Sequence, residues 1–312
     1  MAKIDAARFE KIGANVNERE GIVRPSVSYW KDAMRRFLKN KAAVVCMGII
    51  VVMIFLAIFM PIISPYTFSE QHVTHANAGM FYTDPTDGHM HIFGTDNLGR
   101  DLFVRTWRGA RVSLIIAFTA VFVNMIIGMI YGGISGYAGG RVDDIMMRIV
   151  ELINGIPYLI IVILLMMVME PGMWTLIVAY ATVGWTGMAR LVRGQVISLK
   201  EQEYVVASRV LGAGTFRLLF KHLLPNAMSV IIVNITLAIP SAIFTEAFLS
   251  YIGLGVQVPD SSWGILANAG VVAFRMYPHQ MIIPAVCISL TMLAFNIMGD
   301  GLRDAFDPKL RR

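Results

Sequence analysis

Charged residues are scarce in this chain of 312 amino acids. Asp, Glu, Lys and Arg make up only 15% of it, against 56% hydrophobic residues and a mean hydropathy of +0.62. A soluble domain could not bury that much apolar surface, so the composition predicts a membrane protein. Cysteine is almost absent, and Cys46 and Cys287 both lie in apolar runs, which excludes a disulfide framework.

The sequence also lacks the motifs of several enzyme classes. It contains no G-x-x-x-x-G-K-[ST] phosphate loop, no H-E-x-x-H and no G-x-S-x-G. An intramembrane hydrolase would need a base beside its nucleophile, and no His lies mid-segment near Ser229 or Ser241. Lys, Arg and Asp are missing from the middle of every apolar segment, which disfavours an ion-coupled carrier or a channel. We therefore expect no catalytic residue and no cofactor site on this chain.

Six apolar segments are long enough to cross a bilayer as helices, which takes about 20 residues each. Together they predict an all-α membrane protein with six transmembrane helices. Pro157 and Pro240 should kink two of them, because each removes a backbone hydrogen bond. The six segments are 42–63, 112–139, 152–169, 171–189, 226–245 and 276–299.

The distribution of Lys and Arg predicts the direction of these spans. With the N-terminus inside, 22 of the 27 basic residues lie on the cytoplasmic side, so both termini are expected there, in a cell membrane. This topology accounts for the basic excess without a nucleic-acid partner. Ahead of the first span, Trp30, Met34, Phe37 and Leu38 alternate with basic residues at helical spacing. That pattern predicts an amphipathic helix over 27–41 that lies in the interface against membrane lipid.

Two groups of residues within the spans have a possible role: glycines in helix packing, and polar side chains along a translocation path. Glycines spaced by four let a neighbouring helix approach closely; they are Gly128, Gly132, Gly136 and Gly140. Polar side chains are few, and each could line a translocation path or simply pack; they are Asn124, Asn154, Asn234 and Glu246.

Histidines gather in the first outer loop, at His72, His75, His89 and His91. Such spacing could bind a transition metal. No Cys accompanies them, so we expect ordinary polar loop residues and no metal site.

The stretch 201–226 is too apolar for a free loop and too basic for a span. Gly212 and Gly214 should break it into two short helices, and Pro225 should stop the second. Apolar residues exposed at the cytoplasmic side predict docking on a partner protein, with packing beneath the bundle as the alternative.

This stretch resembles the E-A-A loop of ATP-binding-cassette importer permeases. Val206-Ala207-Ser208, Gly212 and Leu224-Pro225 fall at the family's spacing, although Val206 replaces the leading Glu and His222 stands where Ile is usual. Three further stretches resemble the C-type permeases of oligopeptide, dipeptide and nickel importers. They are 91–101 (H-I-F-G-T-D-N-L-G-R-D, with Ile92 in place of Pro), 246–264 and 299–308. The resemblance runs from about residue 28 to 312.

The resemblance implies half of a translocation path for oligopeptides, with dipeptides or nickel as alternatives. It implies a second homologous permease, two cytoplasmic ATPases that bind ATP and Mg, and an external binding protein. The implied organisation is a polar tail 1–26, the interfacial helix 27–41, a permease domain 42–302 with an outer loop 64–111 and a coupling loop 199–226, and a tail 303–312. The ATPase-coupling residues would be Glu203, Tyr204, Ala207, Ser208, Arg209, Gly212 and Pro225.

Overall fold

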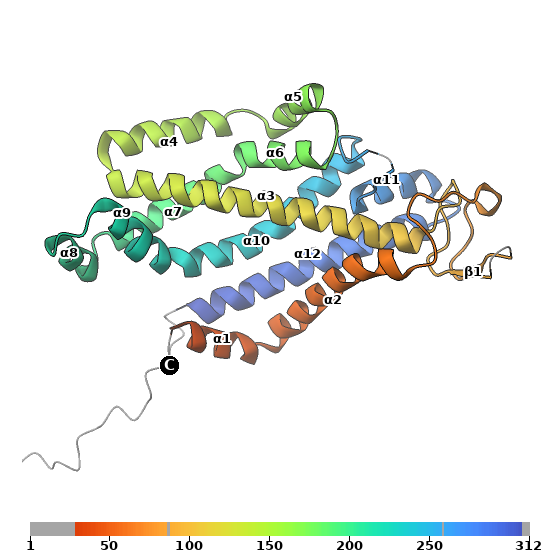
Figure 1. Ribbon diagram of the computed structural model, residues 1–312, viewed down its shortest axis with the longest axis horizontal. Helices are drawn as coiled ribbons and strands as arrows, with labels where there is room; N and C mark the ends of the chain where they lie inside the picture. Colours follow the sequence, from red (N-terminus) through yellow and green to blue (C-terminus); the bar gives the residue numbers. More distant parts are fainter. Residues whose placement is uncertain (1–28, 86–87, 258, 308–312) are drawn as a thin grey trace, which may run out of the picture.

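The computed structural model describes residues 29–85, 88–257 and 259–307, and it is an elongated bundle of long helices (Figure 1). Its α-helices are α1 Tyr29–Lys39, α2 Lys41–Ile63, α3 Leu102–Ala138, α4 Gly140–Asn154, α5 Tyr158–Met169, α6 Met173–Val183, α7 Trp185–Leu199, α8 Glu203–Val210, α9 Thr215–Arg217, α10 Leu224–Tyr251, α11 Trp263–Ala273 and α12 His279–Phe306. The 3-10 turn η3 Val73–His75, the strands β1 Tyr82–Thr83 and β2 Met90–His91, and the π-helix η4 Leu218–Leu223 complete the described elements. The predicted all-α class is confirmed.

Five helical stretches among the described residues are long and apolar enough to cross a membrane. They are Lys41–Ile63, Leu102–Ala138, Met173–Leu199, Thr215–Tyr251 and His279–Phe306.

The third predicted span, 152–169, breaks at the proline that was expected to kink it. It begins in the last turn of α4 and continues as α5, and these two helices meet at an angle of 78°. Pro157 explains the break, because proline cannot donate to the helix and disfavours helical backbone in the residue before it. Pro240, by contrast, lies inside α10, which continues through it.

The helices also extend beyond the apolar segments that revealed them. The predicted outer loop 64–111 ends at Asp101, because Asp101 caps α3 by accepting a hydrogen bond of 2.7 Å from the Val104 N–H. Arg105, Arg108 and Arg111 therefore lie on α3, not in a loop. Likewise α12 runs to Phe306, into the predicted tail 303–312. Charged residues limit the segment that can lie in the hydrocarbon of the membrane, whereas the helix itself continues to its capping residue. The predicted tail 1–26 lies outside the described residues.

The long helix α3 is the centre of the bundle and packs against α2, α6, α7 and α10. Glycines bring its backbone close to that of α7. A Cβ added at Gly132 would lie 2.1 Å from the Ala189 carbonyl oxygen, and one added at Gly136 would lie 2.7 Å from that of Arg193. Gly128 faces α7 in the same way, while Gly140 begins α4 instead. This contact excludes side chains at three successive turns of α3.

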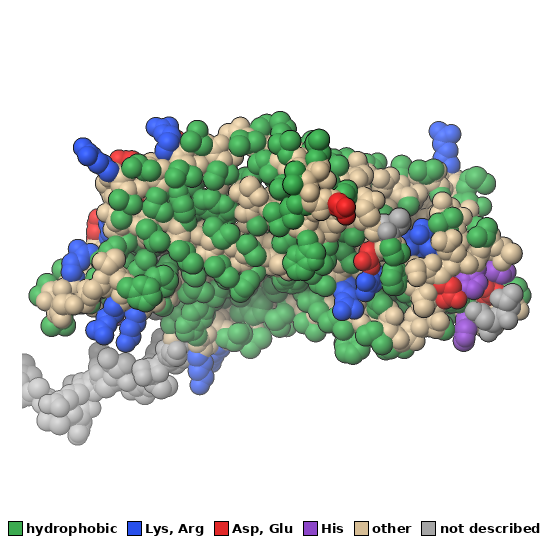
Figure 2. Space-filling model, turned by 45° about the horizontal axis from the view of Figure 1, so that its top comes forward, with side chains coloured by type: hydrophobic (Ala, Val, Ile, Leu, Met, Phe, Trp, Pro, Cys, Tyr) green, Lys and Arg blue, Asp and Glu red, His purple; other side chains and the backbone are tan. Residues whose placement is uncertain are grey.

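The helix α1 forms within the stretch 27–41, where an amphipathic helix was predicted, and packs against α12 and α2. Ala33 and Phe37 are buried, and the Tyr29 hydroxyl donates to the Phe306 carbonyl oxygen of α12 at 3.3 Å. Trp30, Met34 and Leu38 remain exposed along one side. On the face drawn in Figure 2, hydrophobic side chains cover the middle of the molecule and histidines lie at the end opposite α8.

Candidate functional site

The segment between α7 and α10 folds into a compact knuckle, which we define as residues 203–223. Its first helix, α8, ends where Gly212 adopts a φ of +87°, a conformation that favours glycine. The Ala213 N–H bonds to the Ser208 carbonyl at 3.0 Å and the Gly212 N–H to the Arg209 carbonyl at 3.0 Å. These two bonds form the Schellman motif, which satisfies the last carbonyls of α8 and turns the chain back.

The knuckle has an inner face that holds it to the bundle. Val205 is fully buried and packs in one cluster with Val192 and Val196 of α7 and with Leu218 and Leu223 of η4. Burying these side chains fixes α8 to the end of α7.

The outer face of the knuckle carries large apolar side chains that the described residues leave uncovered. Val210 is 81% exposed, Leu211 87% and Phe216 75%. Glu203, Tyr204, Ala207 and Arg209 are also exposed, so four of the seven predicted coupling residues lie on the exposed surface of α8. Large apolar side chains exposed this far typify a protein-docking surface.

Ser208 and Tyr204 have distinct local roles on α8. The Ser208 hydroxyl donates to the Tyr204 carbonyl oxygen at 2.7 Å and is half-buried. Partial burial raises the pKa of the Tyr204 phenol.

The prediction that Pro225 stops the second helix is wrong. The helix passes through Pro225, which occupies the first turn of α10, and continues to Tyr251. The turn just before it is the π-helix η4, in which the Leu224 N–H bonds to the Leu219 carbonyl. The wider π turn accommodates a proline ring that would clash with a carbonyl in α geometry. The knuckle is thus joined rigidly to the fifth span.

Polar contacts between α3, α4 and α7 lie beside the knuckle, and sequence reasoning missed them. Arg193 of α7 forms a bidentate ion pair with Asp143 of α4, at 2.6 and 2.5 Å. Ser135 of α3 also donates to Asp143. The Lys200 ammonium donates to the Gly136 carbonyl at 3.0 Å. Residues 50 positions apart carry no local signal of such a pairing.

Glu246 lies deep inside the bundle and not on an open path. It is 2% exposed, and it accepts hydrogen bonds of 2.7 Å from Ser113 of α3 and from Ser250 one turn along α10. The Ser262 hydroxyl, which caps α11, lies 3.2 Å from that of Ser250. This network joins α3, α10 and the start of α11 through residues of the stretch 246–264.

The other path candidates lie at a different level of the bundle. Asn124 is buried against Gly184, and Asn154 accepts a hydrogen bond of 3.1 Å from Thr186, so both contact the start of α7. Asn124 stands about 16 Å along α3 from Ser113, at 1.5 Å per residue. Asn234 is half-buried on α10. The structure therefore does not bring the four candidates together.

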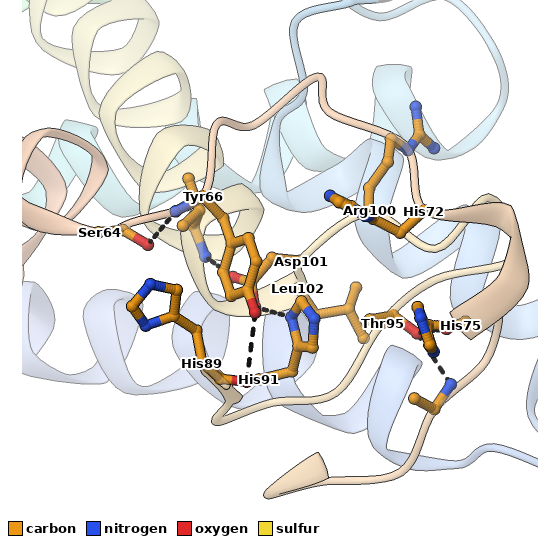
Figure 3. A network of polar contacts seen from close by, with 12 residues as sticks. Ser64, Tyr66, His72, His75, His89, His91, Thr95, Arg100, Asp101 and Leu102 are labelled. Carbon is orange, nitrogen blue, oxygen red and sulfur yellow. Dashed lines mark hydrogen bonds and ion pairs between the residues drawn. The ribbon is translucent and has the colours of Figure 1, made fainter. Parts of the chain in front are cut away.

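The outer loop lies at the end of the bundle opposite α8 (Figure 1), and its polar contacts are drawn in Figure 3. His91 is buried, stacks on Tyr66 with ring centroids 4.2 Å apart, and contacts Asp101 through Nδ1 at 2.7 Å. Asp96 holds Arg100 at 2.7 Å, and Gln280 of α12 donates to the Thr95 carbonyl at 3.0 Å. The stretch 91–101 thus fastens the loop to α3 and α12.

The remaining histidines also have protein partners. His75 contacts the Tyr82 hydroxyl at 2.8 Å and Asp84 at 3.4 Å, and His72 contacts Glu70 at 3.3 Å. Within the described ranges, no three His, Cys, Asp or Glu side chains gather as a metal ion would require.

Two known families match this chain. The family described as "Binding-protein-dependent transport system inner membrane component" matches residues 124–312. The family described as "N-terminal TM domain of oligopeptide transport permease C" matches residues 28–85. The first match contains the knuckle and covers more than half of the chain. The chain belongs to the binding-protein-dependent transport system inner membrane components.

Relatives of this permease match over nearly their whole length. The oligopeptide transport system permease protein OppC of Bacillus subtilis is 52% identical, with 100% of both chains covered. The dipeptide transport system permease protein DppC of the same organism is 51% identical, over 95% of this chain and 90% of that one. OppC of Escherichia coli is 40% identical, over 91% of this chain and 92% of that one.

A solved structure shares the fold of the permease. It is the MetNI methionine ABC transporter, with a TM-score of 0.52 and 19% identity, covering 64% of this chain and 96% of the matched one. Membership of the family makes the chain a multi-pass inner-membrane component that is not itself an ATPase. In this family, ATP binds to partner ATPases, and an external binding protein is part of the system.

Proposed function

We propose that this chain is the permease subunit through which an ATP-binding-cassette importer moves oligopeptides, and that α8 couples it to an ATPase. The exposed apolar face of α8, on a knuckle anchored by buried Val205, carries the proposal. The OppC relatives, at 52% and 40% identity, are oligopeptide transport system permeases, which supports oligopeptides as the substrate class.

The knuckle end of the molecule would face the cytoplasm, with both termini on the same side. The distribution of basic residues supports this orientation, since 22 of 27 fall on that side of the predicted topology. Arg105 and Arg108, on the outer side, are held by Asp96 and Asp260 at 3.6 and 2.8 Å. Their charges are therefore offset locally and do not contradict the orientation.

The assembly would contain a second, homologous permease subunit, two ATPases that hold ATP and Mg, and an external binding protein. Closure of the ATPase pair would move α8, and the rigid connection through η4 and α10 would carry that motion into the spans. The outer-face residues Glu203, Tyr204, Ala207 and Arg209 would contact the ATPase. Ser208, Gly212 and Pro225 would keep the knuckle in shape.

The four intramembrane polar residues would line the translocation path in a conformation of the permease that differs from the one described here. Glu246 is closed off here by Ser113 and Ser250. A movement that parts α3 from α10 would open that contact and present its carboxyl to a solute. Movement of α7 would release buried Asn124 from its contact with Gly184. It would also free Asn154, which is already exposed, from its hydrogen bond with Thr186, and Asn234 is already partly exposed.

Reconstitution of the four kinds of subunit in liposomes tests the proposal, with ATP-dependent uptake of labelled peptides as the readout. Arg209→Glu and Ala207→Trp should uncouple ATP turnover from transport, so that ATP is hydrolysed without peptide uptake while the complex still assembles, because both side chains are exposed and neither holds the fold. Arg148→Glu provides a control, since Arg148 is exposed on α4 outside the knuckle. Normal uptake by both α8 variants would refute the assignment.

A dipeptide permease is the second candidate, because the DppC relative of Bacillus subtilis is 51% identical. Uptake of a length series, from dipeptide to pentapeptide, would separate the two. A nickel permease is less favoured by the structure, since the ring of His91 contacts Asp101 and His75 contacts Tyr82.

A further inference from the structure

Phe81, in the outer loop, has an unusual backbone conformation. Its φ is +58°, and only two other non-glycine residues in the described ranges, Asn77 and Glu170, share a positive φ. For a bulky side chain this left-handed conformation is a genuine outlier that costs conformational free energy. The Phe81 side chain is 62% exposed, so contacts of its own ring within this chain do not offset that cost.

The surrounding loop holds the Phe81 backbone in place. The Phe81 N–H donates to the Ile92 carbonyl at 3.2 Å, and the next residue, Tyr82, pairs with His91 in the β1–β2 hairpin. The rings of Tyr82 and His91 stack on the inner side of this hairpin, with centroids 6.3 Å apart. The Asn77 N–H donates to the Asp96 carbonyl at 2.8 Å just before it. The ring is therefore presented outward from a rigid support.

Two neighbouring methionines extend the apolar surface. Met80 is 45% exposed and Met90 48% exposed, and the register Thr83↔Met90 puts Met90 on the side of the hairpin that faces away from Tyr82 and His91. We define Met80, Phe81 and Met90 as the hairpin patch. It lies at the end of the molecule opposite α8 (Figure 1), on the external face in the proposed orientation.

We propose that the hairpin patch is a docking surface for the external binding protein, with Phe81 as its anchor. The inference rests on the proposed function for its orientation, and on family membership for the existence of the partner. Insertion into lipid requires no defined backbone geometry, whereas a pocket on a folded protein rewards a ring fixed in one direction. Pre-organised aromatic residues typically dominate such interfaces.

The strain at Phe81 permits a decisive variant. Phe81→Gly removes the ring and also relieves the backbone, because glycine adopts this φ freely. Its thermal unfolding temperature should equal or exceed that of the wild type. In the assembled complex in nanodiscs, its Kd for the binding protein, measured by biolayer interferometry, should rise about 30-fold, the loss expected for an anchor residue. In liposomes, the half-saturating concentration of binding protein should rise likewise, with maximal uptake regained at saturation.

Two further variants serve as controls. Phe81→Tyr keeps the ring and should bind within about threefold of the wild type. Val73→Ala removes an exposed apolar side chain from η3 in the same loop and should leave Kd unchanged. An unchanged Kd in Phe81→Gly, or an equal loss in Val73→Ala, would overturn the docking assignment. So would a Phe81→Gly effect confined to the dependence of unfolding temperature on lipid composition, which would place the hairpin patch in lipid. In all these cases ATP-driven peptide uptake by the wild type would leave the proposed function intact, whereas its absence would refute that function.

Discussion

Gly212→Ala is the sharpest perturbation of the knuckle. Gly212 has a φ of +87°, and a Cβ built there would meet no atom within 4 Å. The substitution therefore adds backbone strain without a steric clash, and the left-handed conformation costs an L-residue roughly 1–2 kcal/mol. The knuckle should escape that strain by opening the Schellman turn at the end of α8.

The cost should appear when an ATPase subunit docks, because docking requires the closed knuckle. At 1.4 kcal/mol per tenfold, 1–2 kcal/mol corresponds to about a 5- to 30-fold rise in Kd. Biolayer interferometry of the ATPase on permease pairs in nanodiscs would measure it. Gly212→Asn should lose less, since asparagine tolerates this conformation better than alanine does.

Gly214→Ala is the matched control for Gly212→Ala. Gly214 lies two residues away, is also exposed with nothing within 4 Å of a built Cβ, and has an ordinary φ of −70°. Its substitution should change Kd less than about twofold. Equal effects of the two alanine variants, or wild-type docking by Gly212→Ala, would refute the link between the Schellman turn and coupling.

Two further predictions concern the bundle. Gly132→Ala should lower the thermal unfolding temperature in detergent sharply, because its Cβ would lie 2.1 Å from the Ala189 carbonyl oxygen. Gly48→Ala is the control, because a Cβ built at Gly48 on α2 would meet no atom within 4 Å. This variant should be neutral or should stabilise the protein by up to about 1 kcal/mol. Equal unfolding temperatures for the Gly132→Ala and Gly48→Ala variants would contradict the packing argument. Arg193→Met leaves Asp143 without its partner and should destabilise by about 2–3 kcal/mol in denaturant titrations. Arg148→Met breaks an exposed pair and should cost under about 1 kcal/mol.

The sequence by itself determined the class of this protein and predicted its direction in the membrane. Apolar runs of about 20 residues have few alternatives to spanning helices, because lipid offers backbone groups no hydrogen-bond partner. The basic amphipathic pattern before the first span predicted α1, and the spacing around Gly212 located the knuckle. Both are local signals that depend on residues a few positions apart.

Only the tertiary structure decided how those segments end and what their polar residues do. An apolar segment gives no information about the residue that caps a helix. The helix α3 begins at Leu102, although its apolar segment begins only after the last arginine. A proline in the sequence predicts a break in a helix, but the surrounding backbone decides whether the helix actually breaks. Pro157 divides a span, whereas a π turn lets the helix continue through Pro225. Glu246 finds Ser113 from 133 positions away, and Phe81 is strained by a hairpin whose other strand begins at Met90. Such contacts depend on how distant elements pack, which no local pattern records.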